Sequence, residues 1–249
     1  MKNKINKIII PASFIMAIAI IFSACIKDEK ATADNRPPVV SASWSEEFDD
    51  VGTLGSKGWI ITNKSDLVGP EAWRQGRYES TNKATFGTDY VVGFPAYSAS
   101  KSQNDFISCD FYAGALVANM SVWLISPPTK MKNGDQIIFY TRDAIDDGSF
   151  NIKDGTDRVQ VRANISSTST SVGKDWTTVG DFSALLLEIN PGLVLGGYPT
   201  TWTKYTITLA GITGTVNGRF AFRYFVPQGG PDGINAGEVG IDALSFVSK

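Results

Sequence analysis

Residues 158–165 read RVQVRANI, and apolar and polar side chains alternate along them without a break. A period of two places the apolar side chains on one face of a β-strand and the polar side chains on the other. Residues 218–226, GRFAFRYFV, repeat the pattern, with Phe225 as the one interruption. These two stretches predict half-buried strands, each of which turns only its apolar side to a core.

Other short apolar or β-rich runs lie at residues 122–125, 137–140, 205–209 and 239–247, and turn signals rich in Gly, Asn and Asp separate them. Only residues 182–189 are compatible with a helix, which Pro191 would end soon afterwards. Many short strands without βαβ spacing predict an all-β fold, an antiparallel two-sheet sandwich. Because the sequence after residue 42 contains no internal repeat and no linker, we expect residues 43–249 to form a single domain.

The composition excludes several kinds of site before any motif is considered. The chain has 249 residues and no His, which rules out Ser–His–Asp and Cys–His nucleophilic pairs and every His-containing zinc site. Its 23 Lys plus Arg and 25 Asp plus Glu give a net charge of −2, so the whole chain offers no basic field to a polyanion. We therefore expect no nucleic-acid partner.

Residues 1–24 have the organisation of a signal peptide. Lys2, Lys4 and Lys7 precede an apolar run, residues 8–22, which is too short for a stable membrane span. The run ends in FSAC at residues 22–25, which resembles a bacterial lipobox, where the Cys is acylated and becomes the new N-terminus. We predict that Cys25 is lipidated and anchors the protein in the outer membrane; the alternative is a plain secreted protein.

Residues 25–42 are predicted to be a lipidated tether and linker, because they show no periodicity and contain the stiff pair Pro37 and Pro38. Their first charges, at residues 27–29, resemble the surface-export signal of some Gram-negative outer-membrane lipoproteins, which predicts a domain that faces the extracellular medium. Once Cys25 is acylated, Cys109 has no partner for a disulfide. We expect a buried free thiol there rather than a nucleophile, because the neighbouring Asp110 would raise its pKa.

Several motifs along the domain occur in an order that points to a family. They are WLISP at residues 123–127, a strand pattern at 134–142, DRVQVR at 157–162, GRFAFRY at 218–224 and GID at 240–242. As an ordered set, spanning residues 44–247, they resemble the choice-of-anchor J domain, a relative of the cleaved adhesin domains. The resemblance implies a jelly-roll β-sandwich, galactose-binding-like, in bacterial surface or secreted proteins that are generally not enzymes.

The resemblance also implies structural calcium, which cleaved adhesin domains commonly hold. Glu47 and Asp49 match the place where such domains have N-terminal ligands, and Asp242 matches the acidic position near the C-terminus. A jelly roll brings its first and last strands together, and Ca²⁺ prefers carboxylate and carbonyl oxygens. Family members often carry a second acid after the last Asp, whereas this chain has Ala243. The alternative is a solvated acidic strand end.

Saccharides are bound by flat aromatic faces together with polar side chains that reach the hydroxyl groups. Trp202 is a candidate because the period of two places it with Lys204, Thr206 and Thr208 on a polar face. Trp73, which precedes Arg74, Gln75 and Arg77, and Trp176, which follows Lys174 and Asp175, lie among polar residues and are further candidates, with Arg77 as a polar contact. The alternative for each Trp, taken singly, is burial in the core.

The sequence thus predicts a non-catalytic, surface-displayed lipoprotein whose domain binds a glycan or a host or matrix surface glycoprotein. A second hypothesis is a structural or accessory protein that docks another outer-membrane protein through a sheet edge or an apolar patch. A third is an enzyme that degrades polysaccharide. The adjacent acids Asp146 and Asp147 give no evidence for it, because a glycosidase needs two carboxyls that face each other across the scissile bond.

Overall fold

The structure is a computed structural model, and it describes residues 43–81, 90–144 and 156–249. The predicted signal peptide, Cys25 and the tether, as well as Asp146 and Asp147, lie outside the described residues. No helix in the described ranges is long and apolar enough to cross a membrane.

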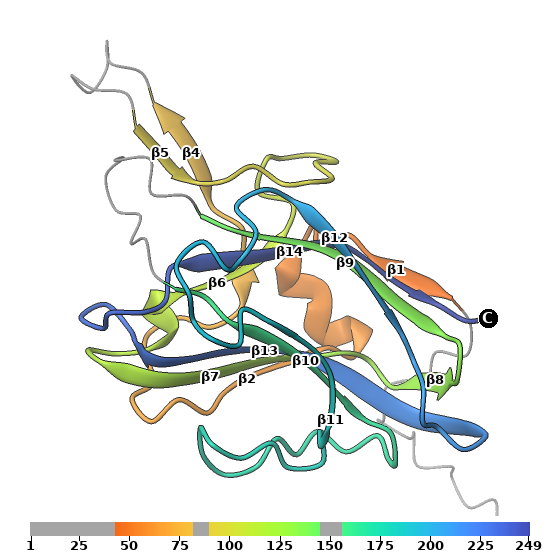
Figure 1. Cartoon of the computed structure of the whole chain (residues 1–249). Coiled ribbons are helices and arrows are strands. Elements are labelled where there is room, and N and C mark those ends of the chain that lie inside the picture. The colour runs from red at the N-terminus through yellow and green to blue at the C-terminus, as the bar shows by residue number, and fades with distance from the viewer. Residues whose placement is uncertain (1–42, 82–89, 145–155) are drawn as a thin grey trace, which may run out of the picture. The chain divides into compact units, whose positions relative to one another are not determined.

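Two antiparallel sheets form the two layers of a sandwich (Figure 1). The first sheet has the order β12 (Thr203–Thr208), β9 (Gln136–Asp143), β14 (Glu238–Val247), β6 (Ile107–Asp110) and β3 (Arg74–Gln75), and β1 (Trp44–Glu46) also pairs with β14. The second sheet has the order β11 (Ala184–Ile189), β10 (Val159–Asn164), β13 (Thr215–Gly229), β7 (Ala118–Ile125) and β2 (Ile60–Asn63), and β8 (Thr129–Lys132) also pairs with β13. The predicted fold class, an all-β antiparallel jelly-roll sandwich, is confirmed.

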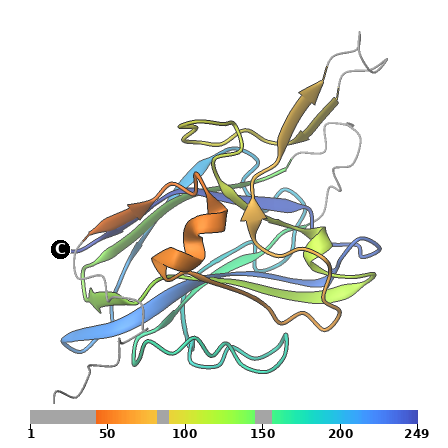
Figure 2. The same ribbon diagram turned by 180° about the vertical axis from the view of Figure 1, so that it is seen from behind.

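Three smaller elements complete the described fold. The hairpin β4 (Tyr78–Thr81) and β5 (Tyr90–Gly93) pairs only with itself. The 3₁₀ helix η1 (Val51–Lys57) lies at one side of the sandwich, where Figure 2 shows it in orange, and its Leu54 joins the core. A second 3₁₀ helix, η2 (Phe111–Ala113), follows β6 and is capped by the Asp110 side chain, which accepts a hydrogen bond from the Tyr112 amide.

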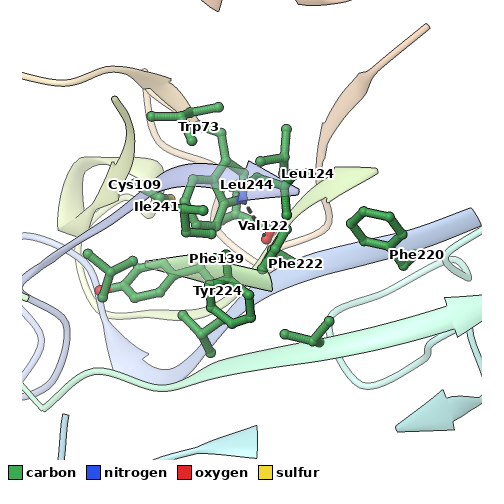
Figure 3. Close-up of a cluster of buried hydrophobic side chains, with 14 of the residues drawn as sticks. Trp73, Cys109, Val122, Leu124, Phe139, Phe220, Phe222, Tyr224, Ile241 and Leu244 are labelled. Carbon is green, nitrogen blue, oxygen red and sulfur yellow. Dashed lines mark hydrogen bonds between the residues drawn. The ribbon is translucent and has the colours of Figure 1, made fainter. Parts of the chain in front are cut away.

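The main core fills the space between the sheets (Figure 3). The alternation in residues 158–165 and 218–226 has the predicted orientation, because Val159, Val161, Phe220, Phe222 and Tyr224 all point into this core. Arg223 and Phe225, on the other side of β13, point away from it. Burial of so many apolar side chains on one face of each strand is the main source of stability in a sandwich of this kind.

Each sheet also carries a smaller buried cluster on its outer face. On the second sheet the cluster consists of Trp123, Ile125 and Ala221 with Val172 and Phe182, which come from the segment between β10 and β11. On the first sheet Phe94, Phe106 and Ala144 cluster together, and Trp202 packs against them. Both outer faces are therefore partly covered by chain, and a binding site on either face must be formed together with the covering segment.

The one stretch whose sequence is compatible with a helix forms a strand instead. Residues 184–189 form strand β11 rather than a helix, and they pair with β10 along an edge of the second sheet. A helix of six to eight residues is marginal on its own, whereas the free edge of β10 offers a complete set of main-chain hydrogen-bond partners. The pairing contains a register shift at Val161 and Arg162, which hides the period of two in this stretch.

The predicted state of Cys109 is confirmed. The thiol is free and 0% exposed, and it lies in the main core. Burial raises its pKa well above the usual value, and the charge of Asp110 adds to the rise. A thiol held in its neutral form in this way has no nucleophilic role.

Candidate functional site

The outer face of the second sheet carries a row of side chains from four neighbouring strands. The register places Gln160 opposite both Glu188 and Arg223, and Arg223 opposite Trp123. Hydrogen bonds follow the row, since Gln160 Nε2 donates to Glu188 Oε1 at 2.7 Å and Arg223 Nη1 donates to Gln160 Oε1 at 3.2 Å. The row is therefore a continuous polar network that ends against the indole of Trp123.

Arg223 is the centre of this network and is only 1% exposed. Its Nε donates to Ser121 Oγ at 2.9 Å, its Nη2 donates to the carbonyl of Trp176, and its guanidinium lies over the Trp123 ring, 4.9 Å from the centroid. Burial lowers the pKa of Arg223 to about 9, and the positive charges of Arg162 and Arg158 add to the effect. The guanidinium thus has neutral hydrogen-bond partners and two cationic neighbours, and Glu188 is the one carboxylate among the causes that act on its pKa.

An aromatic and cationic stack lies beside Arg223. The Phe225 ring has the guanidinium carbon of Arg223 at 3.8 Å from its centroid and that of Arg158 at 4.3 Å. The Trp176 ring lies 5.9 Å from the Phe225 ring at an interplanar angle of 33°. Cation–π contacts of this kind hold guanidinium groups in place while leaving their N–H groups available for hydrogen bonds.

The segment that precedes β11 positions Trp176 over the sheet. Val172 and Phe182 pack into the outer cluster, and Arg219 Nε donates to the Thr168 carbonyl at 2.9 Å. Close to Trp176, the Asp175 Oδ1 accepts bonds from the Thr177 and Thr178 amides, which forms a tight Asx-type turn. The hydrogen bond from the Thr177 hydroxyl contributes most to lowering the pKa of Asp175. The turn orders the main chain around Trp176, and the indole itself packs against Phe225.

Trp176 forms one wall of a pocket of about 420 Å³, which we call the Trp176 pocket. Its lining consists of Asn63, the last residue of β2, of Lys64, Ser65 and Asp66, which follow it, and of Lys174, Asp175 and Trp176. The volume lies within the range of small-ligand sites, about 300–1,000 Å³, and the lining combines one large aromatic side chain with several polar ones. Such a lining can stack against the apolar face of a sugar ring and form hydrogen bonds with its hydroxyl groups.

The two acids of the Trp176 pocket are used within the protein. Asp66 Oδ1 accepts bonds from the Leu67 and Asn119 amides, and its Oδ2 accepts a bond from Asn119 Nδ2 at 2.7 Å. Asp175 is engaged in its own turn. The ammonium groups of Lys64 and Lys174, by contrast, have no ion pair or hydrogen bond with any residue in the described ranges. The free charges of the pocket are therefore positive.

Trp202 lies on the polar face of its strand region, but its surroundings differ from an open platform. It is part-buried on the outer face of the first sheet, where its ring packs edge-on against Phe94 at 5.5 Å and Phe106 at 5.6 Å. Its Nε1 donates to the Pro95 carbonyl at 2.8 Å. The indole N–H is thus used internally. Trp202 is not one of the residues that line the Trp176 pocket.

For the candidate binding residue Trp73 the alternative, burial in the core, holds. It is 3% exposed in the main core, and its Nε1 donates to the Val122 carbonyl at 3.1 Å (Figure 3). Arg77, the predicted polar contact, is exposed, and its Nη2 pairs with Glu71 at 2.7 Å. Glu71 also pairs with Arg74, so Arg77 belongs to an ion network beside the first sheet. Of the four predicted binding residues, only Trp176 lines the pocket.

The predicted calcium ligands are brought together in part. Asp242 is 0% exposed, and its carboxylate accepts bonds from the amides of Tyr97, Ser98 and Ala243. Burial raises the pKa of Asp242 to about 7, and the nearby negative charge of Glu47 adds to the rise. Asp49 Oδ1 is buried and has no hydrogen-bond partner among the residues that the structure describes.

These three side chains do not by themselves form a metal site. In the part of the chain that the structure describes, no group of three or more Asp, Glu, Cys or His is arranged to hold an ion. Calcium takes six to eight oxygen ligands, so main-chain carbonyls would have to supply most of them. The three side chains therefore supply only part of the ligands that a calcium ion would need.

Sequence reasoning missed a buried acidic cluster on the outer face of the first sheet. Arg74 Nη2 pairs with Asp110 and, at 3.3 Å, with Glu238, and these two acids are register partners on β6 and β14. Burial raises the pKa of Glu238 to about 7, with a further contribution from Asp110. Because Arg74 joins both carboxyls, the cluster is an ion network of the fold rather than an open pair of acid and base.

The sequence also gave no signal for the half of the Trp176 pocket that follows β2. Residues 63–66 are an ordinary polar stretch, and only the pairing of β2 with β7 brings them near Trp176. The outward direction of Arg158, Arg162 and Arg223 was predicted by the period of two. Their convergence depends on the register between β10 and β13.

Comparisons with known proteins give fold-level likeness. The K1 cleaved adhesin domain of Lys-gingipain from Porphyromonas gingivalis W83 is similar at a TM-score of 0.44 and 16% identity, over 84% of this chain and 99% of that one. The carbohydrate-binding module TmCBM61, solved with β-1,4-galactotriose, gives a TM-score of 0.38 and 11% identity, over 82% of this chain and 100% of that one. The family 11 carbohydrate-binding module from Clostridium thermocellum gives 0.37 and 11%, over 85% and 98%.

No family model matches the sequence, and no curated protein matches it. Likeness at this level says nothing about what the chain binds, which depends on its own residues.

Proposed function

We propose that this protein is a non-catalytic saccharide-binding module and that the Trp176 pocket is its binding site. The observation that carries the proposal is the pocket itself, in which a large aromatic side chain and several polar side chains line one volume of about 420 Å³. A sugar ring has apolar faces and an equatorial rim of hydroxyl groups. It therefore matches an aromatic wall with polar groups around it.

The proposal includes the location suggested by the sequence. A lipid at Cys25 would anchor the module in the outer membrane, and the charges that follow it would direct the module to the extracellular side. The ligand would then be a glycan of the medium, or a glycoprotein of a host or matrix surface.

The ordered motifs are also the support for placing the chain in the choice-of-anchor J family. That placement remains a proposal, as does calcium at Glu47, Asp49 and Asp242.

The test is a screen of the purified protein against immobilised neutral, acidic and sulfated glycans, followed by titration of the best ligand. We expect saturable binding that weakens about three- to tenfold in Trp176→Ala, since an aromatic contact contributes about 0.5–1.5 kcal/mol beyond buried area. Trp202→Ala is the matched control, because it removes an indole from the other sheet.

A loss in Trp202→Ala with none in Trp176→Ala would move the site to the first sheet and contradict the proposal. Release of reducing ends from a bound polysaccharide would show an enzyme instead.

A second candidate function, docking of another outer-membrane protein, is favoured by an exposed apolar patch. Loops near η2, the start of β7 and the end of β13 are joined by main-chain hydrogen bonds from Ala115 to Leu67 and from Asp232 to Leu116. They expose six large apolar side chains: Leu67, Val68, Tyr112, Leu116, Val117 and Ile234. Exposed apolar side chains gathered in this way are typical of protein contact surfaces. A stoichiometric protein partner that co-purifies with the wild type and is lost from Leu116→Asp would support this function.

A further inference from the structure

We infer that the Trp176 pocket selects saccharides that carry carboxylate or sulfate groups over neutral ones. The inference rests on the proposed saccharide-binding function and specifies its ligand class. It stands on the distribution of paired and unpaired charges around one aromatic wall.

The first step is the state of the charges inside the pocket. Its two carboxylates already accept hydrogen bonds from Asn119 and from the Asp175 turn, so they are occupied. Its two ammonium groups, on Lys64 and Lys174, have no ionic partner among the described residues. A ligand that enters the pocket therefore meets available positive charges, and a ligand anion can form charge-assisted hydrogen bonds with them.

The second step is the charge behind the aromatic wall. Arg223 donates to the Trp176 carbonyl, and Arg158 shares the Phe225 ring with it. The salt bridges of the described residues pair Arg158 only with Glu188, at 3.9 Å, and none of them includes Arg223. The Glu188 carboxylate thus faces three positive charges, those of Arg158, Arg162 and Arg223. Burial lowers the pKa of Arg223, and repulsion by the other two arginines lowers it further.

These two groups of charges reinforce each other. The chain as a whole has a net charge of −2, yet both ammonium groups of the pocket lining and the guanidinium bonded to the Trp176 carbonyl belong to one local group of positive charges. Charges that are partly removed from water act over longer distances than exposed ones. A neutral sugar gains nothing from this local field, whereas a uronate or a sulfated sugar gains from both groups of cations.

The test compares polymers that differ in charge on the same backbone. The pairs are dextran sulfate with dextran, and polygalacturonate with its methyl ester, each titrated against the purified protein at low and at physiological salt. We expect the charged member of at least one pair to bind about tenfold or more tightly, as a charge-assisted contact allows, and the preference to fall as salt screens it. Which pair shows the preference distinguishes sulfate from carboxylate.

A double variant then assigns the preference to the pocket. Lys64→Gln with Lys174→Gln is expected to lose most of the charge preference and to keep the binding that depends on Trp176. The matched control is Lys130→Gln with Lys204→Gln, which removes the same charge from exposed positions on β8 and β12 and is expected to keep the preference.

Each contrary result has a distinct meaning. Equal affinity for both members of each pair would overturn the inference and leave the proposed function standing. Absence of binding to every polymer and to every glycan of the screen would overturn both. Binding of single-stranded DNA as tight as that of the charged polysaccharide would overturn the inference, because it would show attraction to polyanions without selection of a sugar.

Discussion

The guanidinium of Arg223 lies 3.8 Å from the centroid of the Phe225 ring. The two residues are two positions apart on β13, so their side chains share one face of the sheet. Both side chains point out of the sandwich, and the guanidinium bends along the sheet so that it also reaches the Trp176 carbonyl. A side chain of the sheet therefore holds the segment that forms one wall of the pocket. The position of the Trp176 segment on the sheet therefore depends on this residue.

Arg223→Met is expected to loosen the Trp176 segment more than it destabilises the fold. Replacing a buried cation that has no direct ion pair by an apolar side chain of similar length removes its desolvation cost, whereas the main-chain bond to Trp176 is lost. We expect faster amide hydrogen exchange in residues 171–181 and saccharide binding that is about three- to tenfold weaker, with a small change in Tm. Unchanged exchange in that segment would contradict the role given to Arg223. Arg77→Met, beside the other sheet, is the control.

Glu238 is expected to make stability fall as the pH rises from about 4.5 to 7. Burial raises the pKa of Glu238 from 4.5 to about 7, so the folded state holds a proton that the unfolded state has lost. The contribution is complete below pH 4.5 and is lost as the pH passes 7, and its size is on the order of 3 kcal/mol. Denaturant unfolding of the wild type and Glu238→Gln between pH 4.5 and 8 measures it. Parallel curves for the two proteins would show that Glu238 does not titrate in this range.

Gly240→Ala is expected to destabilise the protein, because the aromatic cluster of the first sheet lies directly on this glycine. An added Cβ would come within 2.6 Å of Phe94 Cε2 and 2.9 Å of Trp202 Cη2. Overpacking of this kind costs about 1–3 kcal/mol, which corresponds to a fall in Tm of roughly 2–12 °C at this size. Gly55→Ala is the control, since a Cβ there meets nothing within 4 Å. An equal effect of both substitutions would contradict the close packing.

Chelation is expected to lower Tm if calcium binds at the predicted position. Removal of the ion leaves the negative charges of Glu47 and Asp242 close together, and an ion at a hundred times its Kd contributes about 2.7 kcal/mol to stability. Thermal unfolding with EDTA, with and without added Ca²⁺, is the measurement, and Asp242→Asn should abolish the difference. A Tm that does not respond to EDTA would end the calcium proposal, as would an equal response in Asp242→Asn.

The sandwich was predictable because its central strands carry a strict period of two, which depends only on which face meets the core. The exceptions have physical causes. Residues 184–189 lie at a sheet edge with a register shift, so tertiary pairing decides their structure. Trp73 has polar neighbours in sequence, but it precedes the two-residue strand β3, whose pairing with β6 brings the indole into the core.

The candidate site was predictable only for Trp176. A polar neighbourhood in sequence is shared by Trp73, Trp176 and Trp202, and it does not distinguish a core indole from one that lines a pocket. The distinction depends on residues 63–66, more than 100 positions away, which meet Trp176 through the pairing of β2 with β7. Long-range register of this kind leaves no pattern in the local sequence.

The segment between β10 and β11 rests on its own small cluster around Trp123 and Phe182, separate from the core between the sheets. Mutations in this segment can therefore accumulate, and its length can change, without repacking the sandwich. In evolution such a division allows the ligand to change while the scaffold stays the same. Homologues of this chain should accordingly vary most in the segment that carries Trp176 and least in the strands beneath it.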